Sequence, residues 1–247
     1  MKPVAFDYAP AETLAGALAA LAAPGAKPLS GGQSLAPTMN LRLVRPATLV
    51  DVKPLPGLRD ALETPTGLRL GAAITHAEIE DGAVPDVTCG FLAHVARGIA
   101  YRAVRNRGTI GGSLCHADPA ADWPSCMAAL NATMIVAGQG GERRIPAREW
   151  MRAPFVTALA AGEILLAVEI PRLPPGSRWG YAKINRKVGE FAKALGVALP
   201  GVLLAGAIEG PPALLGSLDD LPPGLDAQHR QLAAVAVTRA AAMRDAA

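Results

Sequence analysis

Two glycine pairs, about eighty positions apart, constrain this chain more than any other feature of its sequence. The first lies in Ser30-Gly31-Gly32-Gln33-Ser34 and the second in Ile110-Gly111-Gly112-Ser113. Glycine lets the backbone turn so that several N–H groups converge, and its missing side chain lets an anion approach closely. One such pair is usually a tight turn, whereas two with similar polar neighbours favour a nucleotide diphosphate held from both sides.

The usual nucleotide-binding motifs do not occur in the sequence. No GxGxxG follows a predicted strand, and there is no GxxxxGK[ST], so neither a dinucleotide-binding Rossmann site nor a P-loop is indicated. Gly32-Gln33-Ser34-Leu35-Ala36 differs from a nucleophile elbow because Ala36 replaces the final glycine. We therefore interpret Ser34 as a hydroxyl that binds a phosphate or its own loop.

Composition excludes several classes of protein. Of 247 residues, 51% are hydrophobic and 18% charged, which argues against disorder, and a net charge of +3 is too weak to suggest nucleic-acid binding. No apolar run approaches the roughly 18 residues of a membrane span, and the N-terminus does not lead into a signal peptide. Cys89, Cys115 and Cys126 lack CxxC spacing, so we expect no metal or cluster site and a cytoplasmic location.

The first part of the chain predicts a small α/β layer that ends near residue 57. Residues 10–23 have leucines at helical spacing, and strand-like runs follow at 27–30 and 48–52. We expect hairpins at 62–72 and 132–145, a strand at 163–170 and a capping box at Thr75–Glu78. Asp86 is expected to precede a helical stretch that runs through Ile99. Asp118-Pro119 is expected to open another helix, with Asp118 as its cap.

A proline- and glycine-rich segment at 171–176 predicts a linker. We therefore divide the chain into residues 1–175, with lobes of about 1–57 and 58–175, and residues 176–247. Beyond the linker, strand-like runs at 179–184 and 196–208 precede a final helix from about Asp226. Leu232, Val235, Val237 and Met243 would form the apolar face of that helix, and few other strands are clear in this part.

Polar residues after the second glycine pair leave two interpretations open. His116 could work with Asp118 or Asp122 as an acid–base pair. Alternatively, Asp118 caps a helix, and Asp122 accepts hydrogen bonds from a sugar or amide group. For Asp122 we favour binding over catalysis.

Four basic residues are also candidates. Arg102, Arg105 and Arg107 precede the second glycine pair and could offset the charge of a pyrophosphate, although such a run more often forms a solvated or partner-binding face. Lys183 lies in an apolar strand, where alternation could direct it toward a cleft; taken alone, it would be a surface lysine that extends its ammonium into solvent.

Four segments occur in the order found in one protein family. They are residues 26–51 with the first glycine pair, residues 105–124 with Thr109-Ile-Gly-Gly-Ser, residues 163–171, and residues 181–192 with Tyr181-Ala-Lys-Ile-Asn-Arg-Lys. Together they resemble the medium subunit of molybdenum hydroxylases, which include carbon monoxide dehydrogenase and bacterial xanthine dehydrogenase-type enzymes. The chain departs from the family at Ser113, usually asparagine, at Ser30, more often alanine, and in a shorter region beyond residue 198.

The resemblance implies an α+β fold, with a two-lobed FAD-binding domain of the para-cresol methylhydroxylase type followed by a small C-terminal α+β domain. FAD would lie between the two lobes, its pyrophosphate enclosed by both glycine segments. Asp122 would bind the sugar or adenosine part, Lys183 would reach the flavin end, and Phe191 would pack near the isoalloxazine ring. The residues expected to bind FAD are Leu29, Ser30, Gly31, Gly32, Gln33, Ser34, Leu35, Ile99, Thr109, Gly111, Gly112, Ser113, Asp122, Leu165 (by its backbone), Lys183 and Phe191.

The function implied is that of an electron-transfer oxidoreductase subunit without catalytic side chains of its own. A large partner subunit would oxidise substrate at a molybdenum–molybdopterin cytosine dinucleotide centre. A small partner would pass electrons through two [2Fe–2S] clusters to this FAD, and an external acceptor would receive them, in a dimer of heterotrimers. Two alternatives remain open: a self-sufficient flavin oxidase or reductase, and a non-catalytic assembly subunit.

Overall fold

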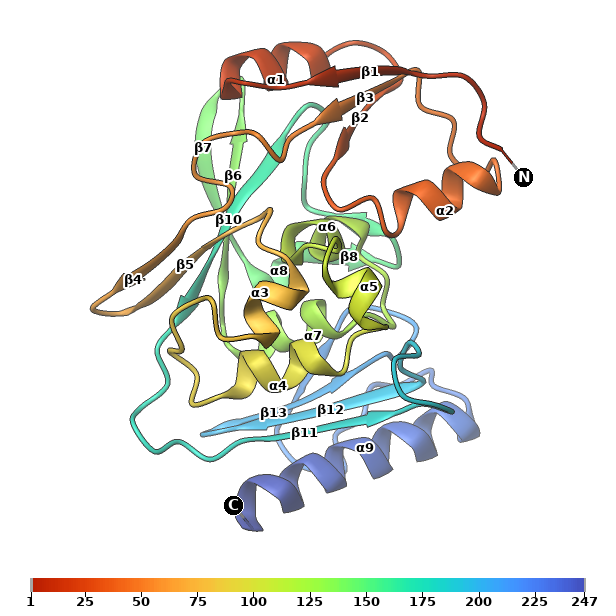
Figure 1. The fold of residues 1–247 in the computed structure, drawn as a ribbon. Coiled ribbons are helices and arrows are strands. Elements are labelled where there is room, and N and C mark those ends of the chain that lie inside the picture. The colour runs from red at the N-terminus through yellow and green to blue at the C-terminus, as the bar shows by residue number, and fades with distance from the viewer. Residues whose placement is uncertain (1, 247) are drawn as a thin grey trace.

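The structure, a computed structural model, describes residues 2–246 and contains three main sheets (Figure 1). The first has three parallel strands in the order β1-β3-β2. Its elements are β1 (Asp7–Pro10), α1 (Leu14–Leu21), β2 (Ala26–Leu29), α2 (Leu35–Asn40) and β3 (Thr48–Asp51). Thr13 caps α1 by accepting a hydrogen bond from the Gly16 N–H. Sequence analysis missed β1 because its four residues are largely exposed and do not alternate.

The second sheet has five antiparallel strands in the order β4-β5-β10-β6-β7. Both expected hairpins are confirmed, as is the capping box at Thr75–Glu78. The elements of this part are β4 (Ala61–Thr64), β5 (Gly67–Gly71), α3 (His76–Glu80), α4 (Phe91–Arg97), α5 (Arg102–Arg105), α6 (Ile110–His116), α7 (Asp122–Ala129), β6 (Thr133–Gly138), β7 (Gly141–Pro146), α8 (Ala147–Trp150), β8 (Met151–Ala153), β9 (Val156–Thr157) and β10 (Ile164–Pro171).

One expected helix is confirmed but shorter than expected, and one expected helix start is wrong. The Asp86 carboxylate accepts hydrogen bonds from the N–H groups of Thr88 and Gly90 in a turn, so α4 begins only at Phe91. Asp118 likewise accepts a hydrogen bond from the Ala120 N–H in a turn, and α7 begins at Asp122. In both segments the carboxylate binds backbone two residues ahead, which forms a turn instead of a helix cap.

The third sheet is antiparallel, with the order β11-β12-β13-β14. Its elements are β11 (Gly180–Ile184), β12 (Ala194–Leu199), β13 (Val202–Gly206) and β14 (Ala213–Leu215), followed by α9 (Ala227–Ala246). The run 196–208 is therefore two strands joined by a Pro200-Gly201 turn, and the expectation of few strands in this region is wrong.

Small residues bring α9 against this sheet. A Cβ at Gly180 would lie 1.8 Å from the Ala240 carbonyl oxygen, and one at Gly196 would lie 2.2 Å from that of Ala236. The buried face of α9 is Ala233, Ala236, Val237 and Ala240, whereas Val235 and Met243, which we expected there, are 37% and 41% exposed. The prediction chose the large apolar residues of the helix. The close approach of α9 to the sheet instead requires small side chains at the contact.

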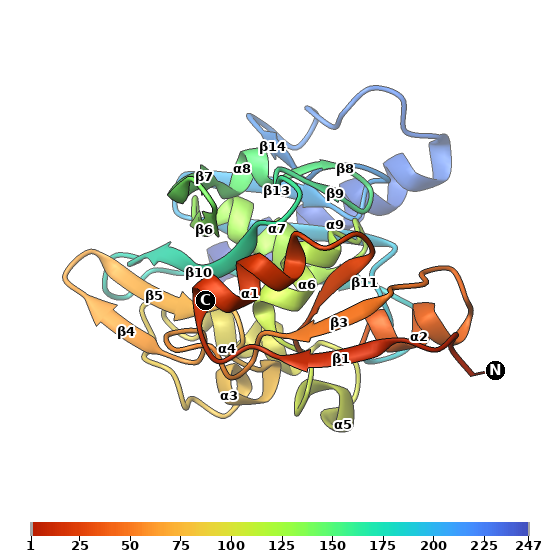
Figure 2. The same ribbon diagram turned by 90° about the horizontal axis from the view of Figure 1, so that it is seen from above.

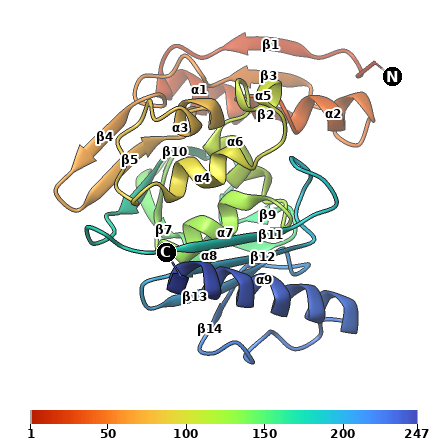
Figure 3. The ribbon, with the colours of Figure 1, turned by 60° about the horizontal axis from the view of Figure 1, so that its bottom comes forward.

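The first and third sheets lie on opposite sides of α6 and α7 (Figure 2). The third sheet lies between α7 on one face and α9 on the other (Figure 3). The largest fully buried side chains include Trp123 of α7, Trp150 of α8 and Phe91 of α4, all in the main core cluster. None of the helices within residues 2–246 is long and apolar enough to cross a membrane.

Candidate functional site

The two glycine segments are in direct contact. A Cβ at Gly31 would lie 2.0 Å from the carbonyl oxygen of Arg107 and 2.8 Å from the Cα of Gly108. The hydroxyl of Ser30 lies 2.9 Å from that of Thr109. The absence of a side chain at Gly31 thus lets the backbone of one segment lie against that of the other.

The first segment has unused hydrogen-bond donors. The backbone N–H groups of residues 31–35 donate to no acceptor within residues 2–246, and the Ser34 hydroxyl makes no hydrogen bond there either. Gly32 has a φ of +72°, which a side chain would strain. Successive free N–H groups on a turning backbone are typical of anion-binding sites.

The second segment differs from our expectation, because it is not a turn. Gly111 and Gly112 lie in the first turn of α6, and the N–H of Gly112 donates to the Thr109 hydroxyl at 3.0 Å. The N–H groups of Ile110 and Gly111 donate to the carbonyl oxygens of Ile74 and Ala72, so these donors do not converge on a ligand. This segment meets the first through the Thr109 hydroxyl and the small surface of Gly112, where a Cβ would lie 4.0 Å from that of Ser30.

A second group of predicted residues meets where α7 faces β11. The ammonium of Lys183 lies 3.0 and 3.1 Å from the two carboxylate oxygens of Asp122 and 3.3 Å from the Gly98 carbonyl oxygen. The Tyr181 hydroxyl donates to the same carboxylate. Burial raises the pKa of Asp122, although Lys183 and Tyr181 oppose the rise, and burial together with the Asp122 charge raises that of Tyr181.

Leu29 ends β2, Leu35 begins α2, and the Gln33 amide donates to the Gly31 carbonyl oxygen.

Three further predicted residues lie elsewhere. Ile99 forms an isolated bridge with Gly189 in the loop between β11 and β12, and Phe191 of that loop is 61% exposed. The loop is fixed to the α6–α7 connection because the Ala192 N–H donates to the Ala120 carbonyl. Leu165 lies in β10, and its side chain belongs to the main core.

Two of the three arginines considered for charge compensation are already paired. Arg102 binds Glu80 and Asp81, and Arg105 binds Glu80 and the carbonyl oxygens of Ile99 and Ala100. The Arg105 side chain is only 11% exposed. These two guanidinium groups hold the segment that precedes α6. Because they are already paired, they are not free to offset the charge of a pyrophosphate.

The acid–base pair considered for His116 does not form. Within residues 2–246 no hydrogen bond joins His116 to Asp118 or Asp122, and its ring instead lies 5.2 Å from that of Phe155. No group of three or more His, Cys, Asp or Glu side chains in the same range is placed to hold a metal ion.

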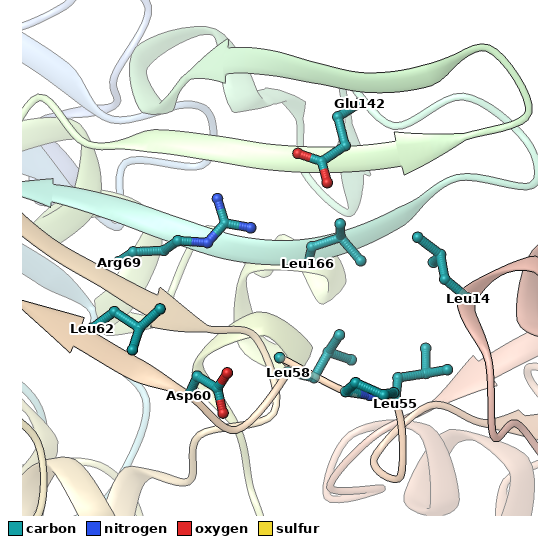
Figure 4. A pocket seen from close by; sticks show the side chains of 10 residues that line it. Leu14, Leu55, Leu58, Asp60, Leu62, Arg69, Glu142 and Leu166 are labelled. Atoms are coloured by element: carbon teal, nitrogen blue, oxygen red, sulfur yellow. The ribbon is translucent and has the colours of Figure 1, made fainter.

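Two cavities lie outside these groups. One of about 310 Å³ lies between α1, the segment after β3 and the second sheet, where leucines meet Asp60, Arg69 and Glu142 (Figure 4). The other, of about 320 Å³, is lined by Pro119, Lys193, His229 and neighbouring residues. Neither includes a residue that sequence analysis assigned to FAD.

Sequence analysis missed Tyr181, Gly98 and Lys53. Tyr181 and Lys183 are two residues apart in β11, so they lie on one face of the strand, and this spacing was a usable signal. Lys53 follows β3, the parallel neighbour of the strand that leads into the first glycine segment. Its ammonium lies 3.4 Å from the Ser30 carbonyl oxygen, a contact that no local pattern predicts.

Residues 4–173 match the model of a family described as the FAD binding domain in molybdopterin dehydrogenase. The chain belongs to this family. It therefore has the expected α+β architecture, a two-lobed FAD-binding domain followed by a small C-terminal α+β domain.

Relatives and a solved structure agree with this assignment. The chain is 39% identical over 194 residues to the 6-hydroxypseudooxynicotine dehydrogenase complex subunit alpha of Paenarthrobacter nicotinovorans, which covers 78% of this chain and 66% of the relative. It is 34% identical over 196 residues to the carbon monoxide dehydrogenase medium chain of Hydrogenophaga pseudoflava, covering 78% and 68%. These matches span about two thirds of each relative. A solved structure of carbon monoxide dehydrogenase from H. pseudoflava aligns with a TM-score of 0.91 at 27% identity, over 100% of this chain and 99% of that one.

Proposed function

We propose that this chain is the FAD-carrying electron-transfer subunit of a multi-subunit molybdenum hydroxylase, in the cytoplasm. Electrons would arrive from two [2Fe–2S] clusters of a small partner subunit, and a large partner with a molybdenum–molybdopterin cytosine dinucleotide centre would oxidise the substrate. The support is the family assignment and the names of the relatives, which are subunits of dehydrogenase complexes. Bound FAD supplies one- and two-electron redox chemistry, which no side chain here provides.

The observation that carries the proposal is the run of N–H groups at residues 31–35 that find no acceptor within residues 2–246, beside the contact between the two glycine segments. A diphosphate is the part of FAD that such donors fit, since they supply fixed partial positive charge without side-chain entropy. The hydroxyls of Ser34 and Ser113 can add donors of the same kind. Thr109 fixes the start of α6 against the first glycine segment, because its hydroxyl caps the helix and contacts the Ser30 hydroxyl.

We propose that Lys183 serves the flavin end of the same site. Because the Asp122 carboxylate lies 3.0 Å from the Lys183 ammonium, the two groups share one end of the cofactor, so we place Asp122 there as well and not at the sugar or adenosine part that the resemblance implied. They come from α7 and β11, so the cofactor would span the part before residue 175 and the part after it. The end of the family match at residue 173 supports that division of the chain. Phe191, exposed on the neighbouring loop, can cover an aromatic ring there.

The test is purification of the tagged chain from its native cells, with cofactor and metal analysis. We expect a yellow complex of three kinds of chain, in a dimer of heterotrimers, with about four iron atoms and one molybdenum per FAD. Denaturation should release FAD from this chain, while iron and molybdenum remain with the partners. A colourless complex would contradict FAD carriage, and oxidation of a substrate by the yellow chain alone would favour a self-sufficient oxidase.

A further inference from the structure

Lys53 lies at the edge of the first sheet where two parallel strands end. β2 leads into the first glycine segment, and β3, its hydrogen-bonded neighbour, leads to Lys53. The carboxyl ends of parallel strands are where ligands bind in open α/β sheets. At this edge the Lys53 ammonium lies 3.4 Å from the carbonyl oxygen of Ser30. Ser30 directly precedes the residues whose N–H groups are free.

A buried carboxylate holds this ammonium in place. Asp51 is 5% exposed and accepts from the Lys53 ammonium at 2.8 Å, the Lys53 backbone N–H at 3.0 Å and the Tyr8 hydroxyl at 2.6 Å. Burial acts to raise the pKa of Asp51, but the hydrogen bonds from Lys53 and Tyr8 outweigh it and hold that pKa below its ordinary value. The carboxylate is therefore charged near neutral pH, and Lys53 is fixed beside Ser30.

The ammonium still has a free donor. A lysine ammonium has three N–H groups, and two of them face Asp51 and Ser30. The Lys53 side chain is 40% exposed, so its third N–H is open to a ligand. Of the other cations considered near the site, Arg102, Arg105 and Lys183 are held by Glu80, Asp81 and Asp122. Arg107 forms no ion pair within residues 2–246, so it is the competing candidate.

We propose that Lys53 binds the diphosphate of the cofactor and thereby makes the site selective for FAD over flavins that lack a diphosphate. This inference rests on the proposed FAD site and adds to it a cation that sequence analysis did not assign. The backbone N–H groups of residues 31–35 would hold the diphosphate, and Lys53 would offset part of its charge. Asp51 and Tyr8 act through Lys53, as positioning residues.

The test compares the dissociation constants of FAD, ADP and riboflavin for the cofactor-free protein and its variants. Lys53→Met should weaken both FAD and ADP about tenfold, because a charge-assisted hydrogen bond to phosphate is lost, and leave riboflavin unchanged. Lys53→Arg should keep most of the affinity. Rising salt should weaken FAD binding more in the wild type than in Lys53→Met, since screening acts on the charge that the variant lacks.

Lys27, an exposed lysine in β2, provides the matched control, and Lys27→Met should bind all three ligands as the wild type does. Equal FAD affinity in Lys53→Met and Lys27→Met would overturn the proposal. An equal loss of riboflavin and FAD affinity in Lys53→Met would also overturn it, because it would indicate a distorted site. A loss of FAD affinity in Arg107→Met without one in Lys53→Met would overturn it as well. Failure of the wild type to bind FAD would instead contradict the proposed function.

Discussion

The hydroxyl groups of Ser30 and Thr109 lie 2.9 Å apart, although 79 positions separate them in the sequence. Thr109 accepts a hydrogen bond from the Gly112 N–H, so its own proton is free to point at Ser30. Either hydroxyl can donate in this contact, since each has one proton and can also accept. The Ser30 hydroxyl therefore links the two segments directly. The family that the chain resembles more often has alanine at this position.

Thr109→Ala should reduce the free energy of unfolding by about 1–2 kcal/mol, because it removes both the cap of α6 and the contact with Ser30. Ser30→Ala should cost about 1 kcal/mol or less. Urea unfolding of the two single variants and the double variant measures their coupling. Thr109→Ser keeps the hydroxyl and serves as the control, and additive losses in the double variant would show that the two hydroxyls do not interact.

Gly31→Ala should destabilise the fold by about 1–3 kcal/mol and separate the two segments, since the new Cβ would lie 2.0 Å from the Arg107 carbonyl oxygen. Gly140→Ala is the matched control, because a Cβ at Gly140 meets nothing within 4 Å. Unfolding midpoints and retention of flavin after gel filtration measure the two effects. Wild-type behaviour of Gly31→Ala would show that the segments are not in close contact.

The sequence predicted the elements of this fold whose signal lies in residues adjacent along the chain. The hairpins, the capping box at Thr75–Glu78 and the final helix were predicted, since each follows from neighbouring residues. β1 was not, because its pairing with β3 comes from a segment about forty residues away. The turn formed by Asp118 was mistaken for a helix cap because the same side chain suits both.

The candidate site shows the same limit. The glycine pairs pointed to two segments that lie against each other, but only the structure reveals that Gly31 serves contact between backbones and that the N–H groups of Ile110 and Gly111 are used internally. The sequence suggested Asp122 and Lys183 separately, and their ion pair depends on how β11 packs against α7. Roles that depend on long-range packing have no local sequence signal.

His76 should make stability depend on pH. Burial, and then the positive charge of Arg105, lowers its pKa from 6.5 to about 4. As pH falls from 6.5 toward 4, the unfolded chain binds a proton that the native state does not, so stability is lost in that window. The loss approaches about 3 kcal/mol below pH 4, at about 1.4 kcal/mol for each pH unit.

Urea unfolding across this pH range measures the effect in the wild type and in His76→Asn. His76 accepts a hydrogen bond from the Trp123 indole at its Nδ1, 3.1 Å away, and the amide oxygen of asparagine can accept the same bond. The variant should therefore fold but lose this part of the pH dependence. An unchanged slope in His76→Asn would show that His76 titrates normally in the native state.

Lys183→Met should destabilise the protein by about 3–5 kcal/mol, because it leaves Asp122 buried without its counter-ion. Asp122 is 3% exposed, and the Tyr181 hydroxyl alone cannot replace the ammonium. Lys183→Met combined with Asp122→Asn should be more stable than Lys183→Met alone, since the buried charge is then gone as well. Lys187→Met, at a lysine side chain that is 65% exposed in the following loop, should change stability by about 0.5 kcal/mol or less. Urea unfolding near neutral pH ranks the variants. Equal stability of Lys183→Met and Lys187→Met would mean that Asp122 is uncharged in the native state. Asp122 and Lys183 would then not join α7 to β11 as an ion pair.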